Sequence, residues 1–245
     1  MASDRKILPH RSDAEVGEVI APLSPQDSPR WLPEPTRVYR IAKRILDIVG
    51  SLVALVLLAP LLVAVAAAIR LTSRGPAFFR DVRLGYHAKP FLLLKFRTMY
   101  TDADPRIHVE YVRRLISRES QAPAGQPVEY EIDEDPRVTR VGLFLRRTSL
   151  DELPQFLNVL RGDMSLVGPR PAIPYEWEAY ADWHKPRLSC KPGMTGLWQV
   201  RGRSRATFED MVLLDLEYAK HPSILLDLRL LIETPGAVLG DKGAY

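Results

Sequence analysis

The sequence is poor in cysteine, since Cys190 is the only one among its 245 residues. An internal disulfide is therefore impossible, which excludes a disulfide-stapled fold and fits a reducing compartment. The five histidines lie far apart, without the spacing of zinc ligands, so we expect no zinc site. No repeat of the about 20–50-residue kind is present. These absences leave a chain that must rely on an ordinary hydrophobic core.

The composition supports such a core, because 46% of the residues are hydrophobic and 26% are charged. The length suits one large domain or two small ones. The net charge is +4 and the pI is about 9.2, which suits anionic partners such as a phosphate-rich membrane face or a nucleotide. We expect no nucleic-acid partner, because no recognised nucleic-acid module is present and acidic residues are interleaved with the basic ones.

Residues 1–37 lack apolar periodicity and contain six of the 21 prolines. We expect a disordered, Pro-rich tail there. No apolar run follows the basic residues near Met1, so we expect no signal peptide.

The longest apolar run covers residues 48–69, and Asp47 is the last charge before it. A straight helix of that length reaches about 33 Å, enough to cross a bilayer core of about 30 Å. Pro60 argues against a straight span, because it removes a backbone donor and crowds the carbonyl of Val56. We therefore expect a kink or break after Ala59.

Charges on the two sides of this run also bear on its path. Basic residues flank it on both sides: Lys43 and Arg44 before it, and Arg70, Arg74, Arg80 and Arg83 after it. Positive flanks prefer the cytoplasmic side. A spanning helix would export one set, whereas a helix that bends at Pro60 and returns keeps both sets inside. Because proline is tolerated in spanning helices, the residues alone leave both paths open.

Two short strands are predicted next, at residues 77–82 and 91–96, with a turn over 85–90. Everything after residue 70 is soluble in character. Lys95 and Arg97 stand at alternate positions, so we expect their side chains on one face. There they could bind phosphate or simply be solvated.

The stretch that suits chemistry best is residues 146–171. Residues 149–152 (Ser-Leu-Asp-Glu) fit a capping box, so Asp151 and Glu152 are expected in the first turn of a helix. Such a helix end binds phosphate, and Arg146 and Arg147 precede it. A carboxylate, two guanidinium groups and a helix N-terminus suit phosphoryl transfer. The plainer alternative is that the two acids only complement the helix dipole.

Four motifs follow the apolar run: Lys-Phe-Arg-Thr-Met at 95–99, Asp-Pro-Arg-Val-Thr-Arg-Val-Gly at 135–142, Ser-Leu-Asp-Glu-Leu-Pro-Gln at 149–155 and Ser-Leu-Val-Gly-Pro-Arg-Pro at 165–171. In this order and spacing the chain resembles the bacterial sugar transferases, also called monotopic polyprenyl-phosphate phosphoglycosyl transferases, from about residue 43 to residue 245. The short tail and the Gly-Ala-Tyr ending resemble the exopolysaccharide-type members.

The resemblance implies an α/β (α+β) fold in a monotopic membrane protein. Residues 1–37 would be the tail, and residues 38–72 a re-entrant membrane helix broken at Ala59 and Pro60. Residues 73–245 would form a cytoplasmic, mainly helical catalytic domain with a small β-hairpin or sheet and interfacial helices. The implied location is the bacterial inner membrane, with the catalytic domain on its cytoplasmic face.

The resemblance also implies an enzyme that moves a sugar 1-phosphate from a UDP-sugar to a polyprenyl (undecaprenyl) phosphate and releases UMP. This would be the first membrane step of exopolysaccharide or glycoconjugate synthesis. Asp151 would attack the phosphorus that bears the sugar and form a covalent intermediate, and Glu152 would assist beside it. Both carboxylates would hold Mg²⁺, which takes oxygen ligands from carboxylates and phosphates.

Seven basic residues are candidate contacts for phosphate or substrate: Lys95, Arg97, Arg146, Arg147, Arg170, Arg201 and Arg203. The family's pattern is not matched everywhere. Ala59 stands where a serine often precedes the breaking proline, so the freed carbonyl must be satisfied otherwise. Ala88 stands where the hairpin turn often has glycine, which puts the turn type in doubt.

One alternative function stays open, a non-catalytic, membrane-tethered scaffold that organises a polysaccharide assembly. The donor sugar cannot be read from the sequence, because it depends on a few pocket contacts. Galactose or glucose on UDP is the expectation for exopolysaccharide-type members. The oligomeric state is equally unreadable, and a homodimer is the commonest form to expect.

Overall fold

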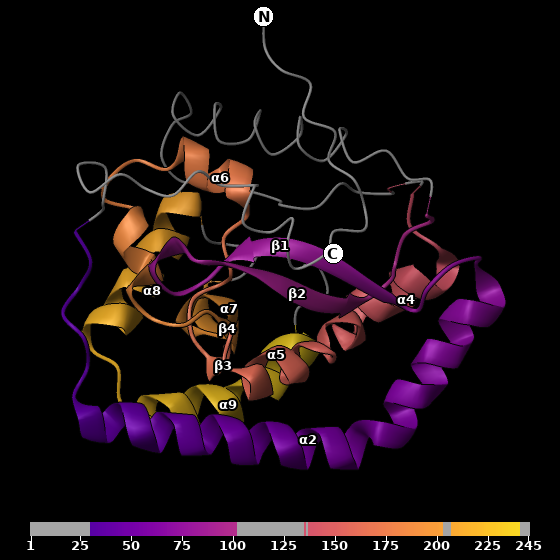
Figure 1. Ribbon diagram of the computed structural model, residues 1–245, viewed down its shortest axis with the longest axis horizontal. Helices are drawn as coiled ribbons and strands as arrows, with labels where there is room; N and C mark the ends of the chain where they lie inside the picture. The colour runs from indigo at the N-terminus through magenta and orange to yellow at the C-terminus, as the bar shows by residue number, and fades with distance from the viewer. Residues whose placement is uncertain (1–29, 102–134, 136, 203–206, 241–245) are drawn as a thin grey trace, which may run out of the picture.

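The computed structural model describes residues 30–101, 135, 137–202 and 207–240. The tail expected over residues 1–37 lies mostly outside the described residues, and residues 30–36 form neither helix nor strand. The described part is a mainly helical body with two small sheets, bordered by one long helix (Figure 1). This confirms the coarse mixed fold that the sequence predicts.

The long helix, α2 (Arg37–Thr72), contains the whole apolar run. It begins after Thr36, whose side chain accepts a hydrogen bond from the N–H of Tyr39. Among the described residues it is the one helix long and apolar enough to cross a membrane. Pro60 lies inside the helix without interrupting it, and the ribbon changes direction along its length (Figure 1). Proline removes one helical hydrogen bond and is a common cause of such bends.

The predicted hairpin follows as β1 (Phe78–Leu84) and β2 (Pro90–Phe96), which pair antiparallel. Directly opposed residues of an antiparallel pair point to the same face. The register pairs Phe79 with Lys95, Asp81 with Leu93, and Arg83 with Phe91. One face of the hairpin therefore presents both Lys95 and Arg83.

The turn of the hairpin is a single 3-10 turn, η1 (Tyr86–Ala88). His87 and Ala88 both have positive φ, at 53° and 57°. This left-handed region favours glycine, because a Cβ atom crowds the backbone there. The turn thus forms with alanine at a position where glycine would be less strained.

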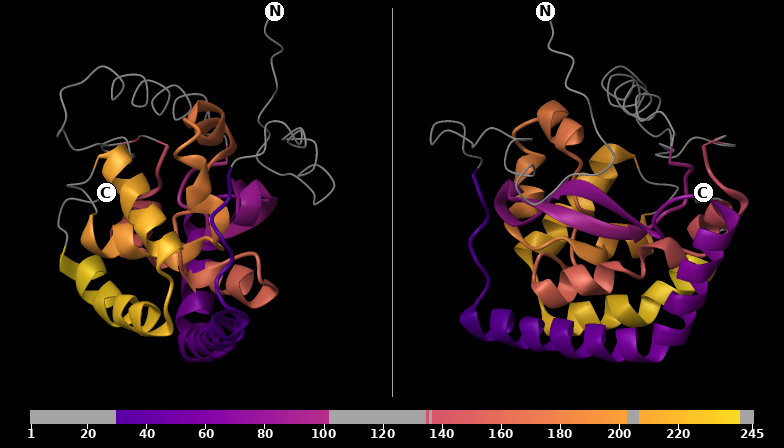
Figure 2. Two further views of the ribbon diagram at one scale, coloured as in Figure 1. Left: turned by 90° about the vertical axis from the view of Figure 1, so that its left-hand side faces the viewer. Right: turned by 45° about the vertical axis from the view of Figure 1, so that its right-hand side comes forward.

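The remaining elements build the body around the hairpin. In chain order they are α4 (Arg140–Arg147), η2 (Leu150–Glu152), α5 (Gln155–Arg161), β3 (Ser165–Val167), α6 (Pro174–Ala179), η3 (Lys185–Ser189), β4 (Gly193–Thr195), α7 (Leu197–Arg201), α8 (Phe208–Lys220) and α9 (Ile224–Gly240). Strands β3 and β4 pair in parallel. Helices α5 and α9 lie along the first part of α2 (Figures 1 and 2).

The first part of α2, before Pro60, and its second part, after Pro60, both contact this body. In the first part, Arg44 donates hydrogen bonds to two carbonyl oxygens at the end of α5, both at 2.7 Å. In the second part, Ile69 packs in a buried cluster with Phe96 of β2 and Leu145 of α4. The outward side between them is apolar and exposed, at Val53, Val56, Leu57 and Val63. The helix therefore borders the body at both ends and leaves an apolar surface uncovered.

Candidate active site

Asp151 and Glu152 lie in η2, a short 3-10 turn between α4 and α5. Ser149, just before it, adopts the left-handed conformation with φ 53°, and its side chain makes no capping hydrogen bond. Helix α5 starts only at Gln155, after Pro154. The predicted capping box is therefore wrong, because Ser149 is left-handed, its side chain caps nothing, and α5 begins only beyond the proline. The two acids do lie in the first turn of a helix, but that helix is the 3-10 turn η2, which precedes α5.

Asn158 fixes α5 beside the strand that carries Lys95. Its side chain is fully buried, accepts a hydrogen bond from the N–H of Leu94 at 2.9 Å and donates to the carbonyl of Leu92 at 2.7 Å. The amide takes the place of a neighbouring strand along β2, so backbone groups there are satisfied. This places η2, which directly precedes α5, next to β2.

Lys95 reaches both carboxylates of the turn. Its Nζ lies 2.6 Å from Oε1 of Glu152 and 3.8 Å from Oδ2 of Asp151. Asp151 is buried and Glu152 is half-buried. Because both carboxylates approach one ammonium group, their oxygens converge on a single point.

The charges around this point stabilise the ionised forms of its residues. Burial raises the pKa of Glu152, but Lys95, followed by Arg170 and Arg83, brings it below its ordinary value. Burial lowers the pKa of Lys95, but the carboxylates of Glu152 and Asp151 raise it above its ordinary value. Glu152 is therefore ionised and Lys95 protonated near neutral pH.

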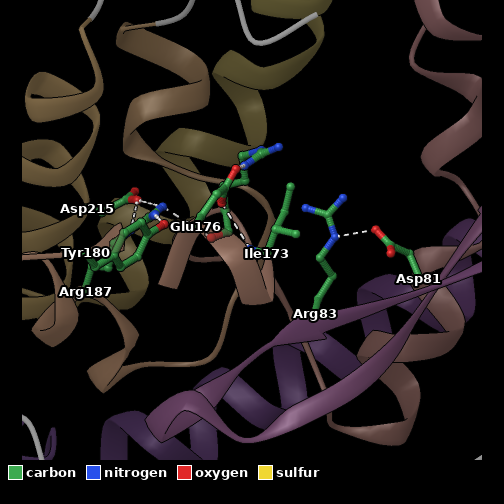
Figure 3. A network of polar contacts seen from close by, with 8 residues as sticks. Asp81, Arg83, Ile173, Glu176, Tyr180, Arg187 and Asp215 are labelled. Carbon is green, nitrogen blue, oxygen red and sulfur yellow. Dashed lines mark hydrogen bonds and ion pairs between the residues drawn. The ribbon is translucent and has the colours of Figure 1, made fainter. Parts of the chain in front are cut away.

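Arg170 and Arg83 approach the site from two different elements. Arg170 Nη1 lies 3.4 Å from Oε1 of Glu176, whose other oxygen accepts the backbone N–H of Ile173 at 3.1 Å. Arg83 donates from Nε to Oδ2 of Asp81 at 2.7 Å. Figure 3 shows its guanidinium pointing from β1 toward the segment of Ile173 and Glu176. Cations from β1, β2 and the loop after β3 thus surround the turn.

A buried polar network supports the loop that carries Arg170. Arg187 is fully buried and donates to Oδ2 of Asp215 at 2.9 Å and to the hydroxyl of Tyr180 at 2.8 Å (Figure 3). It also donates to the backbone carbonyl of Arg170 at 3.3 Å. A buried guanidinium needs such pairing. The network therefore fixes the backbone from which the Arg170 side chain extends.

Two other predicted contacts lie close to the end of β2. Arg146 donates from Nε to Oγ1 of Thr98 at 3.1 Å. Arg97 is not brought to the carboxylates, because its buried guanidinium donates to the carbonyls of Ser73 and Arg74. It therefore satisfies backbone groups just past the end of α2, where a helix leaves carbonyls without partners.

The other three predicted basic contacts are not gathered at the turn by any described interaction. Arg147 is exposed on the last turn of α4. Arg201 places Nε 3.8 Å from Oε2 of Glu233 on α9. Arg203 lies outside the described residues.

Sequence reasoning counted Arg83 only as a basic flank of the apolar run and missed its place beside the carboxylates. The signal was the strand register. Once β1 pairs with β2, alternation puts Arg83 and Lys95 on the same face of the hairpin. Glu176 was missed as well, since its contact with Arg170 depends on how the loop after β3 folds back.

A metal ion bound here would have two protein ligands. Within the described ranges, no group of three or more His, Cys, Asp or Glu side chains converges to hold a metal. Asp151 and Glu152 do converge, as their shared contact with Lys95 shows. Mg²⁺ keeps several waters and binds through one or two carboxylates plus substrate phosphates, so this donor set fits it.

Comparison with known proteins places this chain in a family. A family model described as "Bacterial sugar transferase" matches residues 38–241. Exopolysaccharide production protein ExoY of Rhizobium meliloti is 37% identical over 222 residues, which cover 89% of this chain and 96% of that protein. Undecaprenyl-phosphate galactose phosphotransferase of Salmonella typhimurium is 41% identical over 209 residues, which cover 85% of this chain and 43% of that protein.

A third relative has a different sugar in its name. UDP-glucose:undecaprenyl-phosphate glucose-1-phosphate transferase of Caulobacter vibrioides is 39% identical over 225 residues, covering 87% of this chain and 75% of that protein. The chain spans only 42–43% of the length of several relatives that it matches. The region matched by the family model includes Lys95, Asp151, Glu152 and Arg170. This chain belongs to the bacterial sugar transferase family.

Proposed function

We propose that this chain transfers a sugar 1-phosphate from a UDP-sugar to a polyprenyl (undecaprenyl) phosphate and releases UMP. The observation that carries the proposal is the convergence of Asp151 and Glu152 on Lys95. A weak carboxylate nucleophile needs a target phosphate whose charge is neutralised, and the cations around the turn suit that need. The names of the relatives supply the substrate class, since they specify undecaprenyl phosphate and galactose or glucose.

The reaction would proceed in two displacements. In the first, an Oδ atom of Asp151 attacks the phosphorus that bears the sugar. The bond from that phosphorus to the bridging oxygen breaks, and UMP leaves with the electron pair. In the second, an oxygen of the polyprenyl phosphate attacks the same phosphorus and the bond to Asp151 breaks. The products are a polyprenyl diphosphate sugar and the regenerated carboxylate.

The surrounding residues would orient the reactants and offset their charge. Lys95 contacts both carboxylates, so it can hold the Asp151 oxygen in place for attack. Arg170 is held by Glu176 and by the buried network behind it, which suits it to bind a donor phosphate. Glu152 is kept ionised by these cations and would assist beside Asp151.

Mg²⁺ is part of this proposal, with Asp151 and Glu152 as its protein ligands. When bound, it would supply charge neutralisation to the donor phosphates. The convergence of the two carboxylates on one point favours a shared cation.

We also propose that α2 is a re-entrant membrane helix whose two ends lie on the cytoplasmic face of the bacterial inner membrane. Three features support this: its exposed apolar side, the contact of both its parts with one body, and basic residues on both flanks. Helix α4 packs on the second part of α2 and leads directly into η2. This arrangement would bring Asp151 near the depth at which a lipid phosphate lies.

The proposal is tested with the full chain in nanodiscs, polyprenyl phosphate, Mg²⁺, and UDP-glucose or UDP-galactose, by measuring UMP release. We expect turnover with at least one donor. Asp151→Asn should lower the rate by about 1,000-fold or more, because it removes the attacking carboxylate. Asp182→Asn is a matched control, since Asp182 is an exposed acid that pairs only with Lys185 in the described contacts.

Two outcomes would contradict different parts of the proposal. Asp151→Asn activity within tenfold of the wild type would reject the nucleophile. No UMP from any UDP-sugar with the wild-type chain would reject the enzymatic proposal and favour the scaffold alternative. Mass spectrometry of the wild type incubated with donor alone should detect a sugar phosphate on Asp151.

A further inference from the structure

Arg83 is a mostly buried cation whose hydrogen-bonding capacity is largely unused. Its side chain is 14% exposed. Nε donates to Asp81, and within the part of the chain that the structure describes Nη1 and Nη2 have no hydrogen-bond partner. A guanidinium carries five N–H donors, so four of them are without a protein acceptor there. The two terminal nitrogens are not fully sealed from solvent, so an anion can reach donors that no protein acceptor uses.

Asp81 determines where these unused donors point. It takes the inner nitrogen, Nε, and so leaves the terminal pair of nitrogens directed away from it. Figure 3 shows Asp81 on one side of Arg83 and the segment of Ile173 and Glu176 on the other. A terminal pair of this kind binds phosphate oxygens in a bidentate manner.

The same guanidinium lies within electrostatic reach of the carboxylate turn. Burial raises the pKa of Glu152, while Lys95, Arg170 and Arg83 lower it. Arg83 nevertheless forms its one ion pair, among the described residues, with Asp81. Arg83 thus lies on the same face of the hairpin as Lys95, and its terminal nitrogens are not occupied by the site's own acids.

We propose that Arg83 binds the donor phosphate that leaves with the nucleoside, and that Asp81 is its positioning residue. The inference rests on the proposed function, which places the other donor phosphate at Asp151. When the bridging bond breaks, its electron pair moves onto the departing phosphate, which gains negative charge. A preorganised guanidinium at that position stabilises the charge as it develops. Arg83 therefore acts in the first displacement, in which UMP is released.

This assignment is tested on the first displacement alone. The full chain in nanodiscs is incubated with UDP-glucose or UDP-galactose, whichever the wild type uses, and with radiolabelled UMP, without polyprenyl phosphate. Label enters the UDP-sugar only if UMP release is reversible on the enzyme. We expect Arg83→Gln to slow this exchange by about 10–100-fold, as loss of a charged hydrogen bond predicts. Arg83→Lys should keep part of the rate, because it retains the charge without the paired donors.

Arg80→Gln is the matched control on the same strand. Arg80 is exposed and faces Leu94 in the register, so it lies on the opposite face of the hairpin. The exchange rate of Arg80→Gln should stay within twofold of the wild-type rate. Asp81→Asn provides a second test that leaves Arg83 in place, and it should slow exchange by less than Arg83→Gln does. If Arg83→Gln fails to fold, the exchange rates of Arg83→Lys and Asp81→Asn test the role of Arg83 in its place.

The results separate this inference from the proposed function. Exchange by Arg83→Gln within twofold of the wild type would overturn the role of Arg83, as would an equal loss in Arg80→Gln. If the wild-type chain turns over but exchanges no UMP, the covalent two-step route fails and the assignment to the first displacement fails with it. If the wild-type chain releases no UMP from any donor, the proposed function itself is rejected.

Discussion

Asp47 in the first part of α2 accepts a hydrogen bond from Oγ of Ser165 at 2.8 Å, across 118 positions of the chain. The same carboxylate oxygen accepts the backbone N–H of Leu166 at 2.9 Å. Asp47 is almost completely buried. The last charge before the apolar run is thus a link between the long helix α2 and β3, and it holds the start of that run against the body.

Asp47→Ala should destabilise the folded protein by about 2–5 kcal/mol, because it leaves the Ser165 hydroxyl and the Leu166 N–H buried without an acceptor. Asp47→Asn should lose much less, since the amide oxygen can still accept both bonds. The measurement is thermal unfolding of the full chain in detergent, followed by circular dichroism. Asp182→Ala serves as the exposed control and should change the midpoint little. Equal midpoints for Asp47→Ala and the wild type would refute the link.

Lys95 should determine the pH at which activity begins to fall on acidification, the acid limb of the pH–activity profile. Burial raises the pKa of Glu152. The charge of Lys95 is the main influence that brings this pKa below its ordinary value. In Lys95→Met the largest lowering influence is lost while burial remains, so the pKa of Glu152 rises. If Glu152 must be ionised, the fall in kcat/KM on acidification should begin at higher pH in Lys95→Met than in the wild type. Lys95→Arg should keep the limb near its original place.

The measurement is UMP release against pH at low donor concentration. An acid limb in Lys95→Met that stays at the wild-type pH, or moves to lower pH, would contradict the coupling. A uniform loss of rate without movement of the limb would show that Lys95 binds substrate but does not control the ionisation of Glu152.

The buried pair Arg187–Asp215 should tolerate joint replacement better than single replacement. Arg187→Met leaves Asp215 buried without its partner, and we expect a loss of about 3–5 kcal/mol. The double change Arg187→Met with Asp215→Leu removes both charges and should recover part of this stability in thermal unfolding. It should not recover activity fully, because the carbonyl of Arg170 also loses its donor. A double variant less stable than either single variant would contradict this account.

Features encoded in short stretches of sequence could be predicted. The apolar run, the hairpin with Lys95, and the adjacent acids Asp151 and Glu152 follow from composition, alternation and motif order. Each depends on neighbours within a few residues, where local periodicity is informative. The structure keeps these elements in nearly the predicted ranges.

Features that depend on tertiary contacts could not be predicted. Ser149 has the residue type of a cap but adopts a left-handed conformation and makes no capping hydrogen bond. Arg97 alternates with Lys95 but turns to the carbonyls that follow α2. Asp47 stands at the boundary of the apolar run, but its partner lies in a strand far along the chain. For Arg97 and Asp47, hydrogen bonds to residues distant in the sequence override the local pattern.

Cys190 should be chemically silent in the folded protein. It is half-buried, and burial raises the pKa of its thiol to about 12. At pH about 8, only about one thiol in ten thousand is then ionised, and alkylation needs the thiolate. We expect maleimide labelling of the native protein to be negligible and labelling in denaturant to be complete. Rapid labelling of the native chain would contradict this environment.

A silent Cys190 allows the path of α2 to be tested with single engineered cysteines. Arg37→Cys stands at the first residue of α2 and Arg74→Cys two residues after its last, and both positions are exposed. If the helix returns to the face from which it enters, a membrane-impermeant maleimide should label neither in intact spheroplasts and both in inverted membrane vesicles. The physical reason is that both basic flanks then stay on the cytoplasmic side. Labelling of one position from each side would establish a span and contradict the re-entrant path. In that case only the contact of the body with the second part of α2 would support the proposed placement of Asp151 beside the cytoplasmic headgroups.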